Sequence, residues 1–326
     1  MRIGILGAGS MGRTHAEAYA GMPGVIVAAI VARHEASARE LADHIGAAAL
    51  TDPWKVLDDA SIDAVDVCYP SSVHREYVVA ALERGKHVFC ETPIALSVED
   101  ANAMIEAARA HARIFAVALL MRFISDNAYI REVVTSGELG EPLAVFASRR
   151  SAPYWSREQP AEQAYAEPVI ELGHFDFDYL NWLLGLPSAV FGTGVTGATG
   201  VAEYAFVSLE FDRVRALVEL GAIMPRSYPF STSVRVVCEG GALETTFRLV
   251  EGPENTLTRY PRDGRPEVLD LLRHDPYEQE CAYFVRCVRG EADPSLLSPE
   301  AARDALRVAL AARDSLARGG ERVLLT

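Results

Sequence analysis

A glycine-rich segment near the amino terminus is the clearest candidate for chemistry. Gly7-Ala8-Gly9-Ser10-Met11-Gly12 follows the apolar run Arg2–Leu6 and opens a stretch of helical periodicity. The first glycine permits a tight turn, the second lets the backbone approach a pyrophosphate, and the third allows close helix–strand packing. The amino end of the following helix then offers N–H groups and a positive dipole to phosphates. The segment predicts dinucleotide binding through Gly7, Gly9, Ser10, Met11 and Gly12.

The end of the second apolar run should select between the two nicotinamide dinucleotides. NAD enzymes usually place Asp or Glu there to bind the ribose hydroxyls. Here the run is Ala29-Ile30-Val31-Ala32-Arg33-His34, with no acid before Glu35. A carboxylate would repel a 2′-phosphate, whereas Arg33 would neutralise it. We therefore expect NADP(H) to be preferred with NAD(H) possible, and Arg33 and His34 to lie at the cofactor; the alternative is that Arg33 is a solvated surface residue.

The elements that position these residues follow an alternating pattern. Apolar runs alternate with amphipathic stretches up to about residue 120, and parallel strands need such crossover connections. The pattern predicts a parallel, doubly wound α/β sheet. Its expected strands are Arg2–Leu6, Val25–Val31, Ala64–Cys68, His87–Cys90 and Ile114–Leu119, and its expected helices are Ser10–Ala20, Ala36–Ile45, Ser72–Arg84 and Val98–Ala110.

The second part of the chain has a different pattern of apolar residues. Tyr204–Phe211 and Val214–Leu220 alternate with a period of two, which indicates strands with one buried face. Gly240-Gly241 joins two further such runs, a hairpin signal. We predict an α+β domain with an open, mostly antiparallel sheet and helices on one face, including a helix at 298–317. The expected division is a dinucleotide-binding domain at 1–121 and a substrate-binding and oligomerisation domain at 122–326.

Composition excludes several functions for the 326 residues. Asp and Glu number 45 against 31 Lys and Arg, a net charge of −14, so a nucleic-acid groove is not expected. No apolar run reaches the length of a membrane span, and no signal pattern opens the chain. Five cysteines without ligand-like spacing read as reduced thiols in a cytoplasmic protein. We expect no metal site.

Four segments together resemble the Gfo/Idh/MocA family of nicotinamide-dependent oxidoreductases. They are GAGSMGRTHA, YPSSVH at 69–74, GKHVFCETPIAL at 85–96 and ELGHFDFDYLNWLLG at 171–185, and DPYEQECAYFVRCVRG at 275–290 extends the likeness. The resemblance implies a Rossmann domain, a second domain with an open sheet often used for oligomerisation, and an active site in the cleft between them. It also implies a small-molecule substrate such as a sugar or cyclitol, and a homodimer or homotetramer.

The departures from the family pattern affect its catalytic groups. The family's Glu-Lys-Pro appears here as Glu91-Thr92-Pro93, and threonine donates a hydrogen bond but is a poor acid. The family's aspartate, and the histidine four residues later, are Glu171 and Phe175 here. Phenylalanine moves no proton. The usual lysine and histidine chemistry is therefore lost.

Nearby residues could substitute for the lost groups. His174 stands three positions after Glu171, and residues three apart on a helix are neighbours, so Glu171 could orient His174 as an acid or base. Asp178 could orient it instead, or His174 could simply pack in the structure. Tyr154, in a stretch with Trp155 and Tyr165, could donate a proton.

The resemblance also places residues near the cofactor. Glu91 and Thr92 would lie beside the nicotinamide, and Tyr69, Pro70 and His74 would follow the third strand of the dinucleotide fold. His74 could equally be a satisfied histidine at a helix start. Arg122 falls where the chain crosses between domains and could face the bound molecules.

These residues lead to one hypothesis and two alternatives. We expect an NADP(H)-dependent oxidoreductase with an atypical proton relay, acting on a sugar-like carbonyl or alcohol, an imine or a conjugated substrate. One alternative is a ligand-binding or regulatory protein without turnover, which explains the lost groups simply. The other is a redox-neutral lyase, cyclase or hydrolase on the same scaffold.

Overall fold

The chain forms two compact units in a computed structural model that describes residues 1–153, 167–197 and 200–325. The first unit comprises 1–123 and 274–303, and the second comprises 124–273 and 304–326. The first boundary falls close to the expected division after residue 121. The segment 274–303 differs from that expectation, because it returns to the first unit.

The first unit is built on a six-stranded parallel sheet in the order β3-β2-β1-β4-β5-β6. The chain winds outward from β1 in one direction and then in the other, so the predicted doubly wound sheet is confirmed. A crevice for a ligand is expected outside the carboxyl ends of the strands, where this order reverses. The strands are β1 (Arg2–Leu6), β2 (Ile26–Val31), β3 (Ala48–Leu50), β4 (Ala64–Val67), β5 (His87–Cys90) and β6 (Phe115–Val117).

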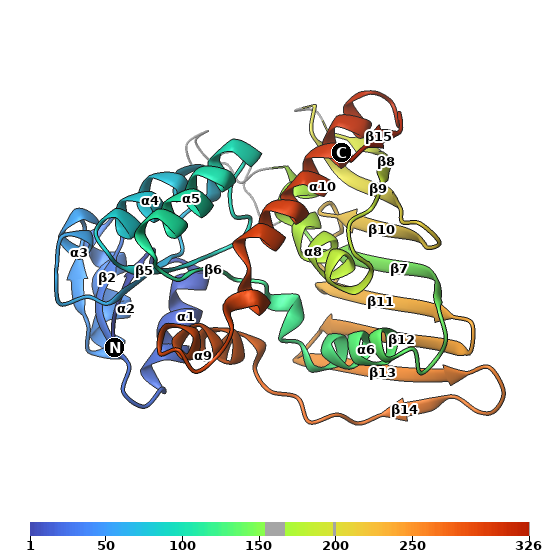
Figure 1. The fold of residues 1–326 in the computed structure, drawn as a ribbon, viewed down its shortest axis with the longest axis horizontal. Coiled ribbons are helices and arrows are strands. Elements are labelled where there is room, and N and C mark those ends of the chain that lie inside the picture. Colours follow the sequence, from blue (N-terminus) through green and yellow to red (C-terminus); the bar gives the residue numbers. More distant parts are fainter. Residues whose placement is uncertain (154–166, 198–199, 326) are drawn as a thin grey trace. The chain divides into compact units, whose positions relative to one another are not determined.

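The crossover helices of this unit begin and end close to the predicted positions (Figure 1). The expected helix at 72–84 is a short 3₁₀ turn, Ser71–Val73, followed by α4, and the short β3 and α3 were not anticipated. The helices are α1 (Ser10–Ala20), α2 (Glu35–Ile45), α3 (Trp54–Leu57), α4 (His74–Glu83), α5 (Val98–His111) and α9 (Pro276–Val288), with further 3₁₀ turns at Leu120–Arg122 and Pro294–Leu297.

Helix α9 explains why a late segment belongs to the first unit. Its Cys281 and Phe284 are fully buried in the core around β1 and α1, and the Phe284 ring stacks on Phe89 of β5 at 5.1 Å between ring centroids. Periodicity in the sequence shows that residues 276–288 form an amphipathic helix. It does not show which sheet the apolar face covers, so the expected domain 122–326 included this helix.

The second unit contains a nine-stranded sheet in the order β14-β13-β12-β11-β7-β10-β9-β8-β15. Among the described strands of this nine-stranded sheet, only β7 and β10 pair in parallel. The predicted mostly antiparallel sheet is therefore confirmed. The hairpin at Gly240-Gly241 joins β11 to β12 as predicted. The strands are β7 (Pro142–Arg150), β8 (Ala189–Thr196), β9 (Ala202–Glu210), β10 (Arg215–Gly221), β11 (Ser231–Cys238), β12 (Gly241–Leu249), β13 (Pro253–Pro261), β14 (Glu267–Leu269) and β15 (Val323–Leu324).

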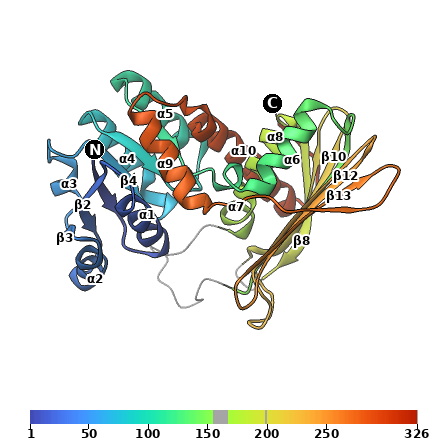
Figure 2. The same ribbon diagram turned by 90° about the horizontal axis from the view of Figure 1, so that it is seen from below.

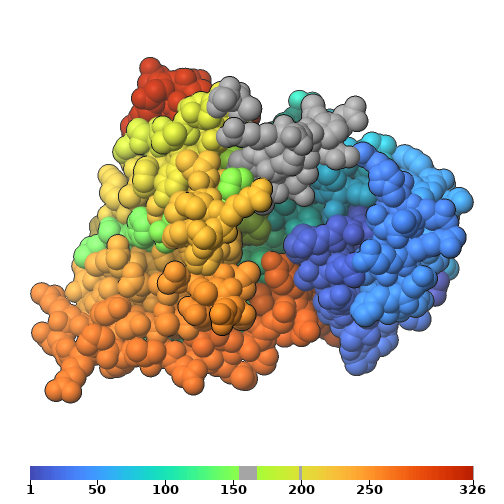
Figure 3. Space-filling model, turned by 180° about the vertical axis from the view of Figure 1, so that it is seen from behind, coloured from blue at the N-terminus to red at the C-terminus, as the bar shows by residue number. Residues whose placement is uncertain are grey.

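Helices cover one face of this sheet, as expected from the period-two strands. α6 (Ser125–Ser136) and α8 (Gly173–Leu184) lie on that face (Figure 2), with the short α7 (Pro168–Glu171) before α8 and the long α10 (Pro299–Ala317) near the end of the chain. In Figure 3 the yellow to orange strands form a surface that no helix of the described chain covers. Phe206, Leu217 and Val237 are exposed on these strands.

Two general expectations can be compared with the structure. All five cysteines are unpaired, as predicted. Within the described ranges, no helix combines the length and the apolar character needed to cross a membrane.

Candidate functional site

The glycine turn between β1 and α1 has the shape that a dinucleotide requires. Gly7 has φ +129°, and a Cβ there would lie 2.6 Å from the Cys68 carbonyl oxygen; a Cβ at Gly12 would strike the Gly7 backbone. Gly9 caps α1 and is exposed, and apart from its chain neighbours no described residue has an atom within 4 Å of its Cβ position. Gly7 and Gly12 therefore allow the chain to close tightly. Gly9 leaves open space beside the first N–H groups of α1, which have no acceptor within the helix.

The end of β2 presents basic side chains. The Gly7 N–H donates to the Val31 carbonyl at 2.9 Å, which brings this strand end beside the glycine turn. Ala32 is buried, whereas Arg33 and His34 are exposed. The first acid, Glu35, pairs with Arg39 at 2.6 Å on α2. Arg33 forms no ion pair with any residue that the structure describes, so its charge is available to a ligand.

His74 is buried and contacts the backbone of the loop that follows β4. Its Nε2 lies 2.7 Å from the Tyr69 carbonyl oxygen and its Nδ1 lies 3.1 Å from that of Ile94. The side chain is buried, and burial lowers the pKa of His74. Both ring nitrogens are thus occupied by backbone carbonyls. His74 ties the Tyr69-Pro70 loop to the segment after β5, and its imidazole is not presented to a ligand.

The Glu91-Thr92-Pro93 motif follows β5 at the carboxyl edge of the sheet. The Glu91 N–H donates to the Val67 carbonyl at 3.0 Å, which anchors the motif beside β4. One Glu91 oxygen, Oε2, accepts a hydrogen bond from the Thr92 N–H at 3.1 Å. The Thr92 hydroxyl is buried and has no hydrogen-bond partner among the residues that the structure describes. Thr92 therefore holds a free donor at the position of the family lysine.

A buried ionic network lies behind this motif, and the sequence did not reveal it. His15 of α1 contacts Asp66 of β4 and Glu91, each at 3.0 Å. The Cys68 thiol donates to Asp66 at 3.1 Å. A charged residue inside the apolar strand Ala64–Val67 was the one available signal, because a buried carboxylate needs a partner.

His15, Asp66 and Cys68 also have the donor atoms of a metal site. Their ligand atoms lie within 4.8 Å of one another, and they form the one such group within the described ranges. The three side chains are already bonded among themselves. We assign no metal to them.

The sequence predicts that Glu171 orients His174, and the structure places these two residues on either side of a helix boundary. Glu171 ends α7 and His174 lies in α8, with Leu172 at the break between the two helices. His174 Nδ1 lies 3.0 Å from the Ile170 carbonyl oxygen, and no described residue forms a hydrogen bond with Nε2. Burial lowers the pKa of His174 to about 3, so the imidazole is neutral near pH 7.

Phe175 occupies the position of the family histidine and contacts an arginine. The Arg149 guanidinium of β7 lies 4.7 Å from the centre of the Phe175 ring. Arg149 also pairs with Asp176 at 2.8 Å, and both partners are buried. The replaced position is therefore part of a packed cation–aromatic arrangement.

Arg122 and Tyr154 are the two remaining site residues that the sequence predicts. Arg122 is buried and donates from Nη1 to the Leu296 carbonyl oxygen at 3.2 Å within the first unit. Tyr154, with its neighbours Trp155 and Tyr165, lies outside the described residues.

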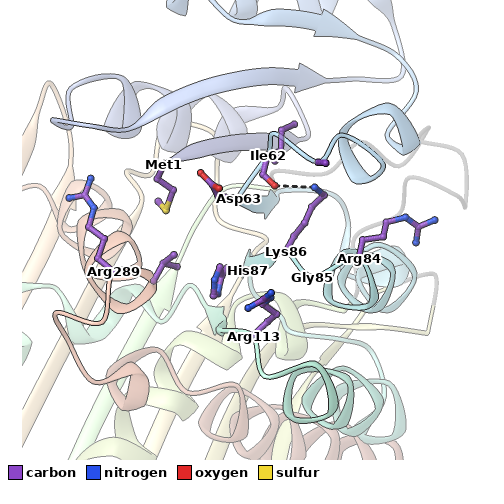
Figure 4. Close-up of a pocket in the computed structure, with 11 residues that line it drawn as sticks. Met1, Ile62, Asp63, Arg84, Gly85, Lys86, His87, Arg113 and Arg289 are labelled. Atoms are coloured by element: carbon purple, nitrogen blue, oxygen red, sulfur yellow. Dashed lines mark hydrogen bonds between the residues drawn. The ribbon is translucent and has the colours of Figure 1, made fainter.

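The first unit has a basic cavity at the edge of the sheet opposite the glycine turn. It measures about 510 Å³ and lies at the amino ends of β1, β4, β5 and β6 (Figure 4). Most of its cations are bonded to the protein itself: Lys86 donates to the carbonyls of Asp59 and Ile62, and Arg84 pairs with Asp58. Its position separates this cavity from the candidate cofactor site.

The parallel sheet, the glycine turn and the open helix end define a dinucleotide-dependent oxidoreductase. Residues 1–119 match the model of the oxidoreductase family with an NAD-binding Rossmann fold, and residues 127–244 match the Gfo/Idh/MocA C-terminal domain. The chain belongs to the Gfo/Idh/MocA family and is an NAD(P)-dependent oxidoreductase.

Named relatives match almost the whole chain. The sequence is 29% identical to myo-inositol 2-dehydrogenase of Thermotoga maritima, over 97% of this chain and 96% of that protein. It is 27% identical to scyllo-inositol 2-dehydrogenase (NAD(+)) of Bacillus subtilis, over 98% and 95%. A putative myo-inositol dehydrogenase from Sinorhizobium meliloti shares the fold with a TM-score of 0.82 and 22% identity, over 100% of both chains.

Proposed function

We propose that this protein is an NADP(H)-preferring oxidoreductase for a small polyhydroxylated molecule, a sugar or a cyclitol. Support for the substrate class comes from relatives named as inositol dehydrogenases. The proton relay would be atypical, because the sequence carries Thr92 and Phe175 where the family has lysine and histidine.

The residues of the first unit would divide the binding of the cofactor. The N–H groups of Ser10, Met11 and Gly12 would hold the pyrophosphate at the start of α1. Arg33, with His34 beside it, would neutralise a 2′-phosphate. Tyr69 and Pro70 would border the same edge of the sheet. When bound, the nicotinamide exchanges a hydride with the substrate carbon.

Thr92 and Glu91 would act at the reacting end. The Thr92 hydroxyl has no partner in the described part of the chain, so it can donate a hydrogen bond to the reacting oxygen of the substrate. A hydroxyl carries no charge, so it polarises that oxygen less strongly than a lysine would. The depressed pKa of His174 fits a packing role better than proton transfer. Glu171 and Tyr154 remain our candidates for moving the proton, because a carboxylate and a phenol both exchange one.

The wider assignments of the chain follow the same reasoning. We propose a homodimer or homotetramer that uses the uncovered face of the nine-stranded sheet, where Phe206, Leu217 and Val237 are exposed, because exposed apolar patches commonly mark interfaces. We also propose a cytoplasmic protein without nucleic-acid partners, given a net charge of −14.

One observation supports the cofactor preference: Arg33 is exposed at the end of β2 and pairs with no described acid, whereas Glu35 is paired with Arg39. Stripped protein titrated with NADPH and NADH should bind NADPH more tightly by about tenfold or more. Arg33→Ala should lose about tenfold in NADPH affinity and leave NADH affinity within about twofold, because only NADPH carries the 2′-phosphate.

Arg113→Ala is the matched control, because Arg113 is an exposed arginine at the opposite edge of the same sheet. It should leave both affinities unchanged. Equal binding of the two cofactors by the wild type would overturn the NADP(H) preference. Binding of neither by folded protein would overturn the proposed function as a whole.

A further inference from the structure

His15 joins the two ends of the candidate cofactor site. It lies in the second turn of α1, the helix that begins at the glycine turn. Its Nδ1 is 3.0 Å from Asp66 Oδ2, and its Nε2 is 3.0 Å from Glu91 Oε1. His15 and Asp66 are 0% exposed, and the Glu91 side chain is 12% exposed. One imidazole therefore links the pyrophosphate helix to the Glu91-Thr92-Pro93 motif.

Two carboxylate oxygens at 3.0 Å, one beside each ring nitrogen, favour a positive charge on the ring. A neutral imidazole has one N–H and can donate to only one carboxylate, so its other nitrogen would turn a lone pair toward the second. The contact between Nε2 and Glu91 lacks the alignment of a hydrogen bond, so its attraction is ionic. Burial lowers the pKa of His15, but the Asp66 carboxylate opposes burial and the pKa lies well above its usual value.

The other groups that face His15 add little charge to the network. Glu280 of α9 is fully buried, no described residue forms a hydrogen bond with its carboxyl oxygens, and burial raises its pKa, which favours the neutral acid. Burial likewise raises the pKa values of Tyr19, Cys68 and Cys281. Phe89 stacks on the imidazole at 5.4 Å between ring centroids. The charges near His15 are thus the two carboxylates that it contacts.

The network fixes the Glu91 carboxylate through both of its oxygens. Oε1 faces His15, and Oε2 accepts the Thr92 N–H at 3.1 Å. Loss of the His15 charge would release Oε1 and leave two carboxylates in the interior without a cation. Glu91 would then turn or take up a proton, and the adjoining Thr92 would shift with it.

We propose that His15 is a positioning residue for the nicotinamide reaction: as a cation between Asp66 and Glu91, it holds the Glu91-Thr92-Pro93 motif in register with the glycine turn. This rests on the proposed place of Glu91 and Thr92 beside the nicotinamide. His15 itself touches neither substrate nor cofactor. Its effect should therefore appear at the nicotinamide half of the cofactor and spare the adenine half.

Cofactor fragments separate these two halves without a known substrate. NADPH and NADH are titrated against wild type and His15→Gln, together with 2′,5′-ADP and AMP, which lack the nicotinamide. His15→Gln should bind the fragments within about twofold of wild type and the matching dinucleotide about tenfold more weakly. His111→Asn is the matched control, because His111 is exposed at the end of α5; it should change neither.

The charge on His15 is read directly from ring nitrogens in ¹⁵N-histidine-labelled protein, with the signal assigned by its loss in His15→Gln. Both nitrogens should remain protonated near pH 7.5, which lies above the ordinary pKa of a histidine side chain. In wild type the dinucleotide affinity should fall as His15 deprotonates at higher pH, and in His15→Gln this dependence should be absent.

The outcomes distinguish the inference from the function on which it rests. A neutral His15 ring near pH 7 overturns the inference, as does a His15→Gln variant that binds dinucleotide normally. Equal weakening of fragments and dinucleotides also overturns it, because that result indicates a general distortion of α1. Wild-type protein that binds neither dinucleotide refutes the proposed function first.

Discussion

Two buried histidines, one in each unit, have opposite electrostatic surroundings. His15 of α1 lies between the carboxylates of Asp66 and Glu91, and its pKa is raised well above the usual value. His174 of α8 has the Ile170 carbonyl oxygen beside one nitrogen and, among the described residues, no partner on the other, and burial lowers its pKa to about 3. Burial opposes the cation at both positions. The identity of the neighbouring groups therefore decides which histidine carries charge.

The difference shows why a histidine near a catalytic motif is a weak signal by itself. His174 stands next to the position of the family histidine, yet its surroundings keep it neutral. His15 stands apart from every catalytic position in the sequence, yet it contacts the motif that carries Glu91 and Thr92. Charge partners identify the second histidine, and these partners come from β4 and from the loop after β5.

Replacing each histidine by leucine should give the largest contrast. His15→Leu leaves Asp66 and Glu91 buried without their cation, and breaking such a buried pair costs about 3–5 kcal/mol. His174→Leu loses the bond to Ile170 but also removes a buried nitrogen without a partner, so the net change should stay within about 1 kcal/mol. Hydrogen exchange of peptides from α1 and α8 measures the free energy of opening at each site.

The two variants serve as controls for each other, because each leaves the other unit's histidine in place. Equal costs at the two sites would show that packing volume, rather than charge pairing, sets the free energy. A negligible cost at α1 would mean that the carboxylates of Asp66 and Glu91 relax without the cation.

Sequence patterns predicted the scaffold and the glycine turn because both depend on local order. The doubly wound sheet, the hairpin at Gly240-Gly241 and the tight turn at Gly7 follow from periodicity and from glycine spacing. The network of His15, Asp66 and Glu91 could not be predicted in this way. Its members lie 51 and 25 residues apart along the chain, counted from His15 to Asp66 and from Asp66 to Glu91, and only the strand order brings them together.

The groups that contact the His174 ring could not be predicted from the sequence either. The spacing from Glu171 to His174 suggested neighbours on one helix, but the helix breaks at Leu172. Which carbonyl or carboxylate faces a ring depends on that break. A change of partner from carboxylate to carbonyl turns a candidate acid or base into a neutral packing group, and residue type alone does not report it.

Acidification should lower the local stability around His174 but not around His15, and this effect should be smaller than that of the leucine variants. Because the folded pKa of His174 lies below its unfolded value of about 6.5, its contribution to stability is present above that value and is lost as the pH falls toward 3. At pH 5 the loss relative to pH 7.5 should be about 2 kcal/mol. Hydrogen exchange of α8 peptides at both pH values, in wild type and His174→Leu, measures it.

The raised pKa of His15 gives the opposite sign. Its contribution to stability is fully present below about pH 6.5 and is lost as the pH rises through the folded pKa. Peptides of α1 should therefore not share the acid loss that α8 shows, and His174→Leu should remove that loss from α8 alone. An acid response of α8 that persists in His174→Leu would assign it to other groups.

Thr92→Val should change stability least while changing activity. The Thr92 hydroxyl is buried without a partner in residues 1–153, 167–197 and 200–325. Valine has nearly the same shape, so the free energy of unfolding should change by no more than about 0.5 kcal/mol or should rise slightly. If the hydroxyl donates to the reacting oxygen, turnover should fall by about 10²-fold. Thermal unfolding measures the change in stability. Nicotinamide absorbance with myo-inositol, the substrate in the name of one relative, measures the change in turnover.

Thr92→Ser, which keeps the hydroxyl, should retain most of the turnover. A large loss of stability in Thr92→Val would show that the hydroxyl is bonded within the protein, as the atoms around His15 are, and full turnover would remove Thr92 from the reacting end of the site.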